Sequence, residues 1–223
     1  MSQKCNNGKD NELAVRITEI FHSIQGEGLY TGIPMLFVRT NRCNLRCTWC
    51  DSKYTFTGGE ELSTEEVAAQ ATESWENWIC FTGGEPLIQR DAADFLKAVT
   101  EAGRRVLVET SGAVNIEKFT FSDLVNFDMD VKTPSSGESG SFIIDNLKFL
   151  RHGDYLKFVI SDQSDYDFSR KFLKLVPAGI PAVFQPCWGT DPKWLVESVI
   201  HDRVQARVMT QLHKQIWGEI RGV

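Results

Sequence analysis

The stretch Cys43-Asn44-Leu45-Arg46-Cys47-Thr48-Trp49-Cys50 places three cysteines in a Cys-x3-Cys-x2-Cys spacing. It lies just beyond the apolar run Met35-Leu36-Phe37-Val38-Arg39-Thr40, which predicts a buried strand. Three thiolates on one loop at a strand end can hold three corners of a [4Fe–4S] cube. The fourth iron then has no protein ligand, so a small molecule can bind it directly. The spacing therefore favours an iron–sulfur site.

Two other interpretations of these cysteines were weighed. A structural zinc site needs four ligands and is usually closed by a second Cys or His pair. The remaining cysteines, Cys5, Cys80 and Cys187, stand singly and offer no such pair. Disulfides are disfavoured because the three cysteines are too close together and no secretory signal is recognisable. A zinc knot, and with it a binding module rather than an enzyme, stays open as the alternative.

Length, charge and hydropathy narrow the class of protein. A chain of 223 residues fits one domain with a full hydrophobic core, and we expect a flexible tail over 1–13 and a single domain over 14–223. The net charge of −6 argues against direct nucleic-acid binding. No apolar run approaches the roughly 18 residues of a membrane span. Unpaired cysteines without a targeting segment predict a cytoplasmic location.

Strands and helices alternate along the chain, which predicts parallel β/α packing. Ser63 and Glu66 form a capping box for a helix to about Ser74, and Asp91 is expected to cap a second helix ending near Gly103. Further helices are predicted over 142–150, 168–176 and 193–201. Strands are predicted over 15–20, 35–40, 78–82, 106–108, 124–131, 155–160, 182–184 and 206–209. The core strands are too few for a closed eight-stranded barrel.

The cysteine spacing, with an aromatic residue before the last cysteine, resembles that of the radical S-adenosylmethionine (SAM) enzymes. Within them, several further stretches resemble the 7-carboxy-7-deazaguanine synthase family, from about Val15 to the last residue. These stretches are Ser23-Ile24-Gln25-Gly26-Glu27-Gly28, Phe37-Val38-Arg39-Thr40, Cys50-Asp51-Ser52, Thr82-Gly83-Gly84-Glu85-Pro86, Glu109-Thr110-Ser111-Gly112 and the ending Gln211-Leu212-His213, Trp217-Gly218, Arg221-Gly222-Val223.

The resemblance implies a fold and a reaction. The fold would be a partial, open (β/α)6 barrel of the radical SAM type with trimmed helices. The reaction would be a carbon–nitrogen lyase reaction, in which 6-carboxy-5,6,7,8-tetrahydropterin becomes 7-carboxy-7-deazaguanine with loss of ammonia, for queuosine or archaeosine. It also implies a [4Fe–4S] cluster, SAM as a catalytic cofactor, Mg²⁺, an external flavodoxin- or ferredoxin-like electron donor, and a homodimer.

The resemblance also assigns the cofactor residues. Cys43, Cys47 and Cys50 would ligate three irons, and SAM would bind the fourth. Trp49 would lie against the adenine, with a core aromatic as the alternative. The backbone of the Gly83-Gly84 turn and Glu85 would receive the amino group of SAM. The other expected SAM contacts are Asp51, Thr110, Ser111, Asp130, Lys132 and Gln185. Asp130 departs from the Ser-Pro-Lys pattern that the family often has there.

A pterin with a carboxylate needs amide-like partners for its ring edge and a cation for its acid. By resemblance, Glu27 and Gln25, with the backbone of Ile24 and Gly26, would read the aminopyrimidinone edge. Arg39 would pair with the substrate carboxylate, with a strand-end salt bridge as the alternative. Thr82 and His213 would complete the wall of the substrate-binding site.

Ser52 would supply one oxygen to Mg²⁺, which prefers hard oxygen ligands and keeps several waters. A plain turn at Asp51-Ser52 is the alternative, because both side chains readily bond to nearby backbone.

An activase that places a glycyl radical on a protein partner is the enzyme alternative. It has the same cysteine spacing but no need for Gln25, Arg39 or Ser52.

Overall fold

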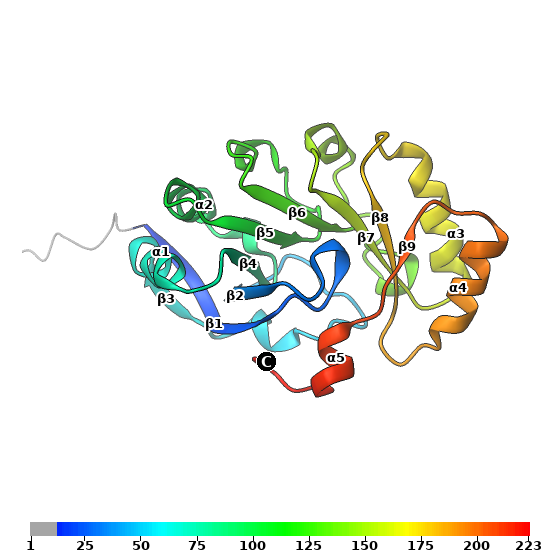
Figure 1. The fold of residues 1–223 in the computed structure, drawn as a ribbon, viewed down its shortest axis with the longest axis horizontal. Helices are drawn as coiled ribbons and strands as arrows, with labels where there is room; N and C mark the ends of the chain where they lie inside the picture. Colours follow the sequence, from blue (N-terminus) through cyan, green and yellow to red (C-terminus); the bar gives the residue numbers. More distant parts are fainter. Residues whose placement is uncertain (1–12) are drawn as a thin grey trace, which may run out of the picture.

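The computed structural model describes residues 13–223, which form one curved sheet with helices packed on it (Figure 1). The sheet has nine strands in the order β3-β1-β2-β4-β5-β6-β7-β8-β9 and does not close on itself. The expected tail over 1–13 lies outside the described residues except for Leu13. Among the described residues, no helix has the length and apolarity needed to cross a membrane.

Six long neighbouring strands run parallel and form the centre of the sheet, as the sequence predicts. A short seventh, β9 (Arg207–Val208), extends them. At the other edge, β1 (Ala14–Ile24) and β3 (Glu60–Ser63) pair antiparallel. The six are β2 (Pro34–Thr40), β4 (Trp78–Gly83), β5 (Arg105–Thr110), β6 (Val125–Asp130), β7 (Tyr155–Ile160) and β8 (Ala182–Pro186).

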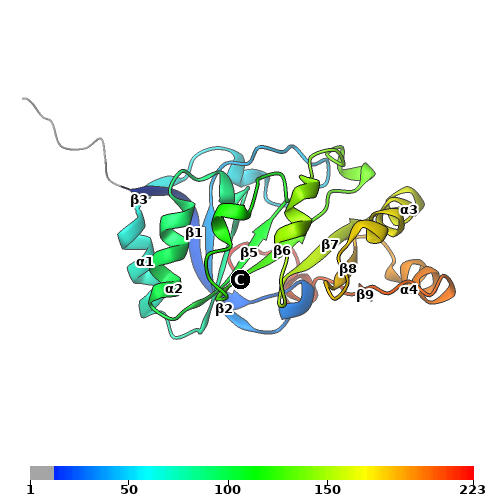
Figure 2. The ribbon, with the colours of Figure 1, turned by 90° about the horizontal axis from the view of Figure 1, so that it is seen from above.

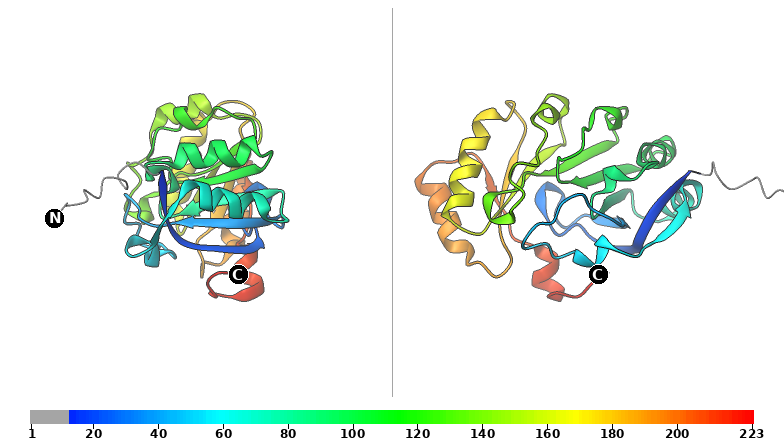
Figure 3. Two further views of the ribbon diagram at one scale, coloured as in Figure 1. Left: turned by 90° about the vertical axis from the view of Figure 1, so that its left-hand side faces the viewer. Right: turned by 180° about the vertical axis from the view of Figure 1, so that it is seen from behind.

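Four helices cover the convex face of the sheet: α1 (Thr64–Glu73), α2 (Ala92–Glu101), α3 (Gln163–Phe172) and α4 (Pro192–His201) (Figures 1 and 2). The connections on either side of β6 hold only short 3-10 turns. The helices are therefore trimmed, as expected. A short helix, α5 (Leu212–Trp217), lies with the C-terminus on the opposite side of the sheet (Figure 3).

The strands present different side chains to the two faces. On β6, Phe127 and Met129 enter the hydrophobic core beneath the helices, whereas Asp128 and Asp130 point the other way. Because the side-chain period of a strand is two, one strand supplies core and cavity alternately. This alternation gives the concave face its polar lining.

The local sequence signals predicted some helix caps and helix bounds correctly and others incorrectly. Ser63 accepts a hydrogen bond from Glu66 N at 3.1 Å, so this cap is confirmed. The cap expected of Asp91 is wrong: its carboxylate accepts from Ala14 N at 2.8 Å and thereby fastens β1. The helix predicted over 142–150 is a 3-10 segment, Ile144–Phe149. The helix predicted over 168–176 begins earlier, because Asp162 caps it by accepting from Asp165 N.

Candidate active site

A cavity of about 580 Å³ opens at the carboxyl ends of the parallel strands. All the residues that the sequence marked for cofactor, metal or substrate line it, with one exception, Glu85. Residues 218–223 line it from the opposite side. Side chains from both ends of the chain therefore converge on one chamber, at the edge where β/α folds carry their sites.

The three clustered cysteines share one wall of the cavity and all three are free thiols. Cys50 N donates to Cys47 O at 3.2 Å, and Leu45 N approaches the Cys43 sulfur at 3.4 Å. Burial raises the pKa of Cys43 and raises that of Cys47 to about 11. Since metals bind thiolates, loading this loop must release protons.

The arrangement of the thiols fits a cluster better than a single metal ion. Within residues 13–223, no three His, Cys, Asp or Glu side chains converge closely enough to hold one ion. A structural zinc requires such convergence, because its four ligands surround one centre. In a [4Fe–4S] cube each thiolate binds its own iron, so sulfurs spread along one loop suffice.

The Gly83-Gly84 turn is packed against the start of the cysteine loop. A Cβ on Gly84 would lie 2.0 Å from Arg42 O, and Gly83 has a φ of +142°. Glu85 N donates to Arg42 O at 2.9 Å. Arg42 itself adopts a φ of +71°, a conformation that costs a non-glycine residue energy. The glycines thus allow the close backbone contact that sets where the cysteine loop begins.

Glu85 is fully buried behind the wall, and the structure does not bring it into the cavity. Its carboxylate accepts from Thr110 Oγ1 at 2.8 Å, and from the N and Oγ of Ser111 at 2.8 and 2.6 Å. Glu85 therefore orients Thr110 and Ser111, which do line the cavity.

Unpartnered acceptors lie near the thiols and fit a ligand rich in N–H and O–H donors. Asp130 Oδ1 and Gln185 Oε1 are buried and have no hydrogen-bond partner in the part of the chain that the structure describes. Lys132 pairs with Asp130 at 2.9 Å, and its ammonium lies 5.1 Å from the centre of the Trp49 ring. A buried acceptor without a donor costs free energy. The amino and hydroxyl groups of SAM are donors of the kind that this end of the cavity lacks.

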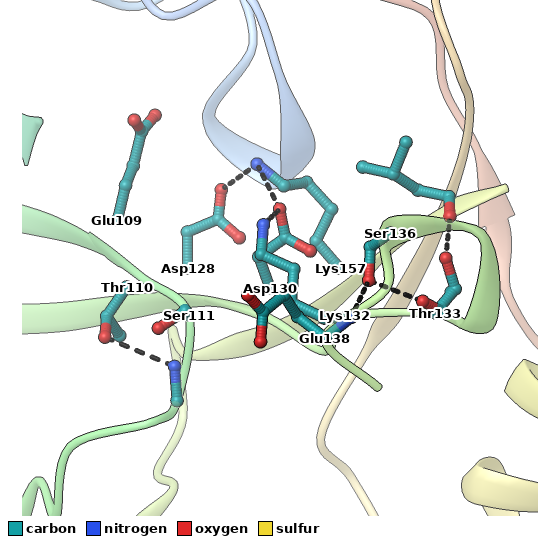
Figure 4. Close-up of polar contacts among 12 residues, drawn as sticks. Glu109, Thr110, Ser111, Asp128, Asp130, Lys132, Thr133, Ser136, Glu138 and Lys157 are labelled. Carbon is teal, nitrogen blue, oxygen red and sulfur yellow. Dashed lines mark hydrogen bonds and ion pairs between the residues drawn. The ribbon is translucent and has the colours of Figure 1, made fainter. Parts of the chain in front are cut away.

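A buried lysine organises the floor of the cavity. Lys157 Nζ contacts Glu27 at 2.7 Å, Asp128 at 3.1 Å and Asp130 at 4.0 Å; Figure 4 shows the ammonium between the two aspartates. Burial acts to lower the pKa of Lys157, but the carboxylates outweigh it and raise that pKa well above its usual value. Burial likewise opposes ionisation of Glu27, but Lys157 and a hydrogen bond from Gln211 hold its pKa well below the usual range.

The ionised form of Asp128 is disfavoured in this cluster around Lys157. Burial raises its pKa to about 7 despite Lys157, and the nearby carboxylate of Glu109 adds to the effect. Within residues 13–223, no group makes a well-formed hydrogen bond to its Oδ1 or to the buried hydroxyl of Tyr155.

Gln25 and Thr82 are held by a carboxylate that the sequence did not single out. Gln25 Nε2 donates to Glu109 at 2.9 Å, and Thr82 Oγ1 donates to the other oxygen of Glu109 at 2.6 Å. Glu27 N donates to Gln25 Oε1 at 3.0 Å. The segment 24–27 therefore enters the cavity in a fixed orientation, with Ile24 and Gly26 also in the lining.

Arg39 is anchored by one edge of its guanidinium. Its Nε donates to Glu19 at 2.8 Å, and no acceptor among residues 13–223 contacts its terminal nitrogens. Burial acts to lower its pKa, but the acidic groups around it, Tyr54 and Glu109 among them, raise it. A charged guanidinium whose two terminal nitrogens still offer four N–H donors suits a carboxylate.

His213 and Ser52 lie at the mouth of the cavity. A Cβ on Gly26 would lie 2.0 Å from His213 Nδ1, so glycine is required for the histidine to approach. Ser52 Oγ donates to Asp51 at 3.0 Å, and the other oxygen of Asp51 pairs with Lys214 at 2.9 Å. Burial opposes ionisation of Asp51, but Lys214 lowers its pKa.

Sequence reasoning assigned no role to four residues that build the floor: Glu109, Asp128, Lys157 and Gln211. Glu109 and Gln211 stand in two of the stretches that carry the family resemblance, and the other two have a signal of their own. Asp128 alternates with core residues on β6, and Lys157 interrupts the apolar strand β7. A charge in such a strand is disfavoured unless it is paired.

The fold and the three-thiol loop define a radical SAM protein. Residues 37–160 match the model of the Radical SAM superfamily. A 7-carboxy-7-deazaguanine synthase from Thermoplasma acidophilum is 51% identical over 93% of this chain and 99% of its own. One from Koribacter versatilis is 42% identical over 94% of this chain and 100% of its own. The crystal structure of QueE from Escherichia coli aligns with a TM-score of 0.75 at 21% identity, covering 90% of this chain and 95% of that one.

The chain therefore belongs to the 7-carboxy-7-deazaguanine synthase family within the Radical SAM superfamily. Membership implies an enzyme that uses a [4Fe–4S] cluster and SAM. It does not favour the zinc knot or the glycyl-radical activase.

Proposed function

We propose that this enzyme converts 6-carboxy-5,6,7,8-tetrahydropterin into 7-carboxy-7-deazaguanine and ammonia, in the route to queuosine or archaeosine. The observation that carries this proposal is the composition of the cavity lining. Three thiols line the cavity, and an anchored arginine and a fixed amide–carboxylate pair line it as well. We call these two groups of residues the cofactor end and the substrate end. A small, flat, polar acid complements the second group.

Each part of the substrate has a complementary group in the chain. The terminal nitrogens of Arg39 would bind the carboxylate in a bidentate manner. The Glu27 carboxylate, kept ionised by Lys157, would accept from the adjacent N–H donors of the aminopyrimidinone. Gln25, fixed through Glu109, would bond to the same ring edge. Thr82 and His213 would close the wall.

Cys43, Cys47 and Cys50 would hold the cluster, with Trp49, Asp130, Lys132 and Gln185 around SAM. When bound, the cluster and SAM would supply a radical that can take a hydrogen atom from the pterin. The protein itself would orient the pterin towards the site of that radical and keep water away from it. The conversion is redox-neutral, because the product differs from the pterin by one ammonia, so SAM can be re-formed.

Ser52 would bring its hydroxyl to Mg²⁺ together with substrate oxygens and water, and Asp51 would accept from a metal-bound water. The proposal is supported by their place at the mouth of the cavity and by the chemistry of their oxygens. It is tested by a Mg²⁺ titration under anaerobic turnover. We expect Mg²⁺ to raise turnover in the wild type and in Ser52→Thr, which keeps the oxygen, and the response to be blunted in Ser52→Ala. Identical responses in wild type and Ser52→Ala would leave Ser52 only a turn residue.

A homodimer, a flavodoxin- or ferredoxin-like electron donor and a cytoplasmic location complete the proposal. The assay that tests it combines reconstituted protein, SAM, reductant and the carboxypterin without oxygen. We expect a free deazaguanine acid and ammonia in equal amounts. Radical transfer to a protein partner, without a small-molecule product, would instead favour the activase.

A further inference from the structure

The turn that follows β6 binds the cysteine loop at several points. Thr48 donates from both its N and its Oγ1 to Ser136 O, at 2.9 and 3.2 Å. Arg46 N donates to Glu138 Oε1 at 2.7 Å. The turn is itself rigid: Thr133 Oγ1 donates to Val159 O at 2.7 Å and Ser136 Oγ to Thr133 O at 2.5 Å (Figure 4). The position of the cysteine loop thus depends on a segment almost ninety residues along the chain.

One contact of this turn reaches the aromatic residue before the last cysteine. Trp49 Nε1 donates to Ser135 Oγ at 3.1 Å. Ser135 Oγ donates to Asp165 Oδ2 at 2.5 Å, and Ser135 N donates to Asp165 Oδ1 at 2.8 Å. Ser161 N donates to Asp165 Oδ2 at 2.9 Å. Asp165 is fully buried on the first turn of α3.

The direction of this chain of hydrogen bonds is set by the indole, whose N–H can only donate, so a lone pair of the Ser135 hydroxyl faces Trp49. The hydroxyl proton of Ser135 is then directed at Asp165 Oδ2, 2.5 Å away, rather than at Ser161 Oγ, 3.2 Å away. Because each bond polarises the next, the short bond to Asp165 strengthens the bond to the indole.

We propose that Asp165 is a positioning residue that acts through Ser135 to fix the Trp49 indole and the cysteine loop for SAM binding. The inference rests on the use of SAM by this enzyme but not on the identity of its pterin. The indole is held from two directions, by Ser135 at its edge and by the Lys132 ammonium over its ring. A ring fixed in this way presents a preformed surface to the adenine of SAM.

The test measures SAM affinity of the reconstituted, cluster-loaded protein by equilibrium dialysis, with iron content and urea unfolding measured in parallel. Asp165→Asn is expected to raise the Kd for SAM about tenfold at wild-type iron content. Asp154→Asn is the matched control. Asp154 is equally buried and also accepts from two backbone amides, Phe127 N and Arg151 N, at the opposite end of β6. It should lower stability and leave the Kd unchanged.

Ser135→Ala keeps the backbone bond to Asp165 and removes the hydroxyl that links Asp165 to Trp49, so it decides the matter if Asp165→Asn does not fold. We expect Ser135→Ala to raise the Kd in the wild-type background. In a Trp49→Phe background it should leave the Kd unchanged, because phenylalanine has no N–H for Ser135 to accept. Wild-type SAM affinity in Ser135→Ala, or an equal loss in Asp154→Asn, would overturn the inference. Absence of deazaguanine product would contradict the proposed function and leave this inference standing.

Discussion

The two ends of the cavity are built in different ways. The cofactor end consists of contiguous segments, the cysteine loop and the glycine turn, held by backbone hydrogen bonds and close packing. The substrate floor consists of single side chains from distant strands, gathered around Lys157. The cysteine loop and the glycine turn are held by several backbone hydrogen bonds, to each other and to the turn after β6, whereas the floor residues depend on one buried lysine. A single substitution among the floor residues should therefore lower both the affinity for the substrate and the stability of the protein.

The largest effect expected at the cofactor end is loss of the cluster. Cys43→Ala, Cys47→Ala and Cys50→Ala should each abolish the visible absorption of the cluster and SAM cleavage, since each removes the ligand of one iron. Cys187→Ala, which removes a cysteine lining the same cavity, should keep both. Iron analysis and absorbance after anaerobic reconstitution measure this. Full iron and activity in Cys47→Ala would refute the assignment.

At the floor, Lys157→Met should destabilise the fold by about 3–5 kcal/mol, because it leaves buried carboxylates without their counter-ion. Urea unfolding of the purified protein gives the value. Lys193→Met on exposed α4 is the control, with an expected change of about 0.5 kcal/mol or less. If both variants lose the same small amount, the floor is not organised by this lysine.

These two ends also differ in how far the sequence predicts them. The parallel packing of the core strands and the cap at Ser63 follow from local patterns that the structure bears out. Asp91 was misread because its partner, Ala14 N, lies 77 residues away, and no helical signal foretells such a contact. The same limitation hid the floor: Glu27 and Lys157 are 130 residues apart in sequence, and only the folded sheet brings them together.

Glu85 shows what a motif leaves open. By resemblance Glu85 would receive the SAM amino group, and in the structure its carboxylate accepts hydrogen bonds from Thr110 and Ser111. A motif indicates which residues belong to a site, but the packing of its neighbours decides which atoms face the ligand.

Replacing Arg39 should affect the affinity for the carboxypterin and the affinity for SAM differently. Arg39→Ala should weaken carboxypterin binding by about 2–3 kcal/mol, the cost of losing a charged partner in a desolvated pair. SAM binding should be largely unaffected. Equilibrium dialysis of each ligand measures both quantities, and an equal loss of SAM affinity would mean that Arg39 serves the cofactor or the fold.

A smaller effect concerns pH. Folding raises the pKa of Asp128 from 3.8 to about 7, so between these values the folded protein keeps a proton that the unfolded chain has released. Stability should therefore fall as pH rises through this window, on the order of 1 kcal/mol per pH unit. Glu27 acts in the opposite sense, but only below its unfolded pKa of 4.5.

Unfolding by urea from about pH 5 to about pH 7 measures this slope. Asp128→Asn should flatten it, since the amide does not titrate. Asp94→Asn, on α2 outside the cavity, should leave the slope as in the wild type. A slope that persists in Asp128→Asn would assign the pH dependence to another group.

The most direct test of a cavity with two separate ends follows two products in one anaerobic assay: 5′-deoxyadenosine from SAM, and 7-carboxy-7-deazaguanine from the carboxypterin. Wild type should form the deazaguanine. Arg39→Ala should still cleave SAM with reductant while forming little deazaguanine at a pterin concentration that is limiting for wild type. A wild type that forms no deazaguanine, or an Arg39→Ala variant that loses SAM cleavage and deazaguanine formation in equal measure, would contradict the account.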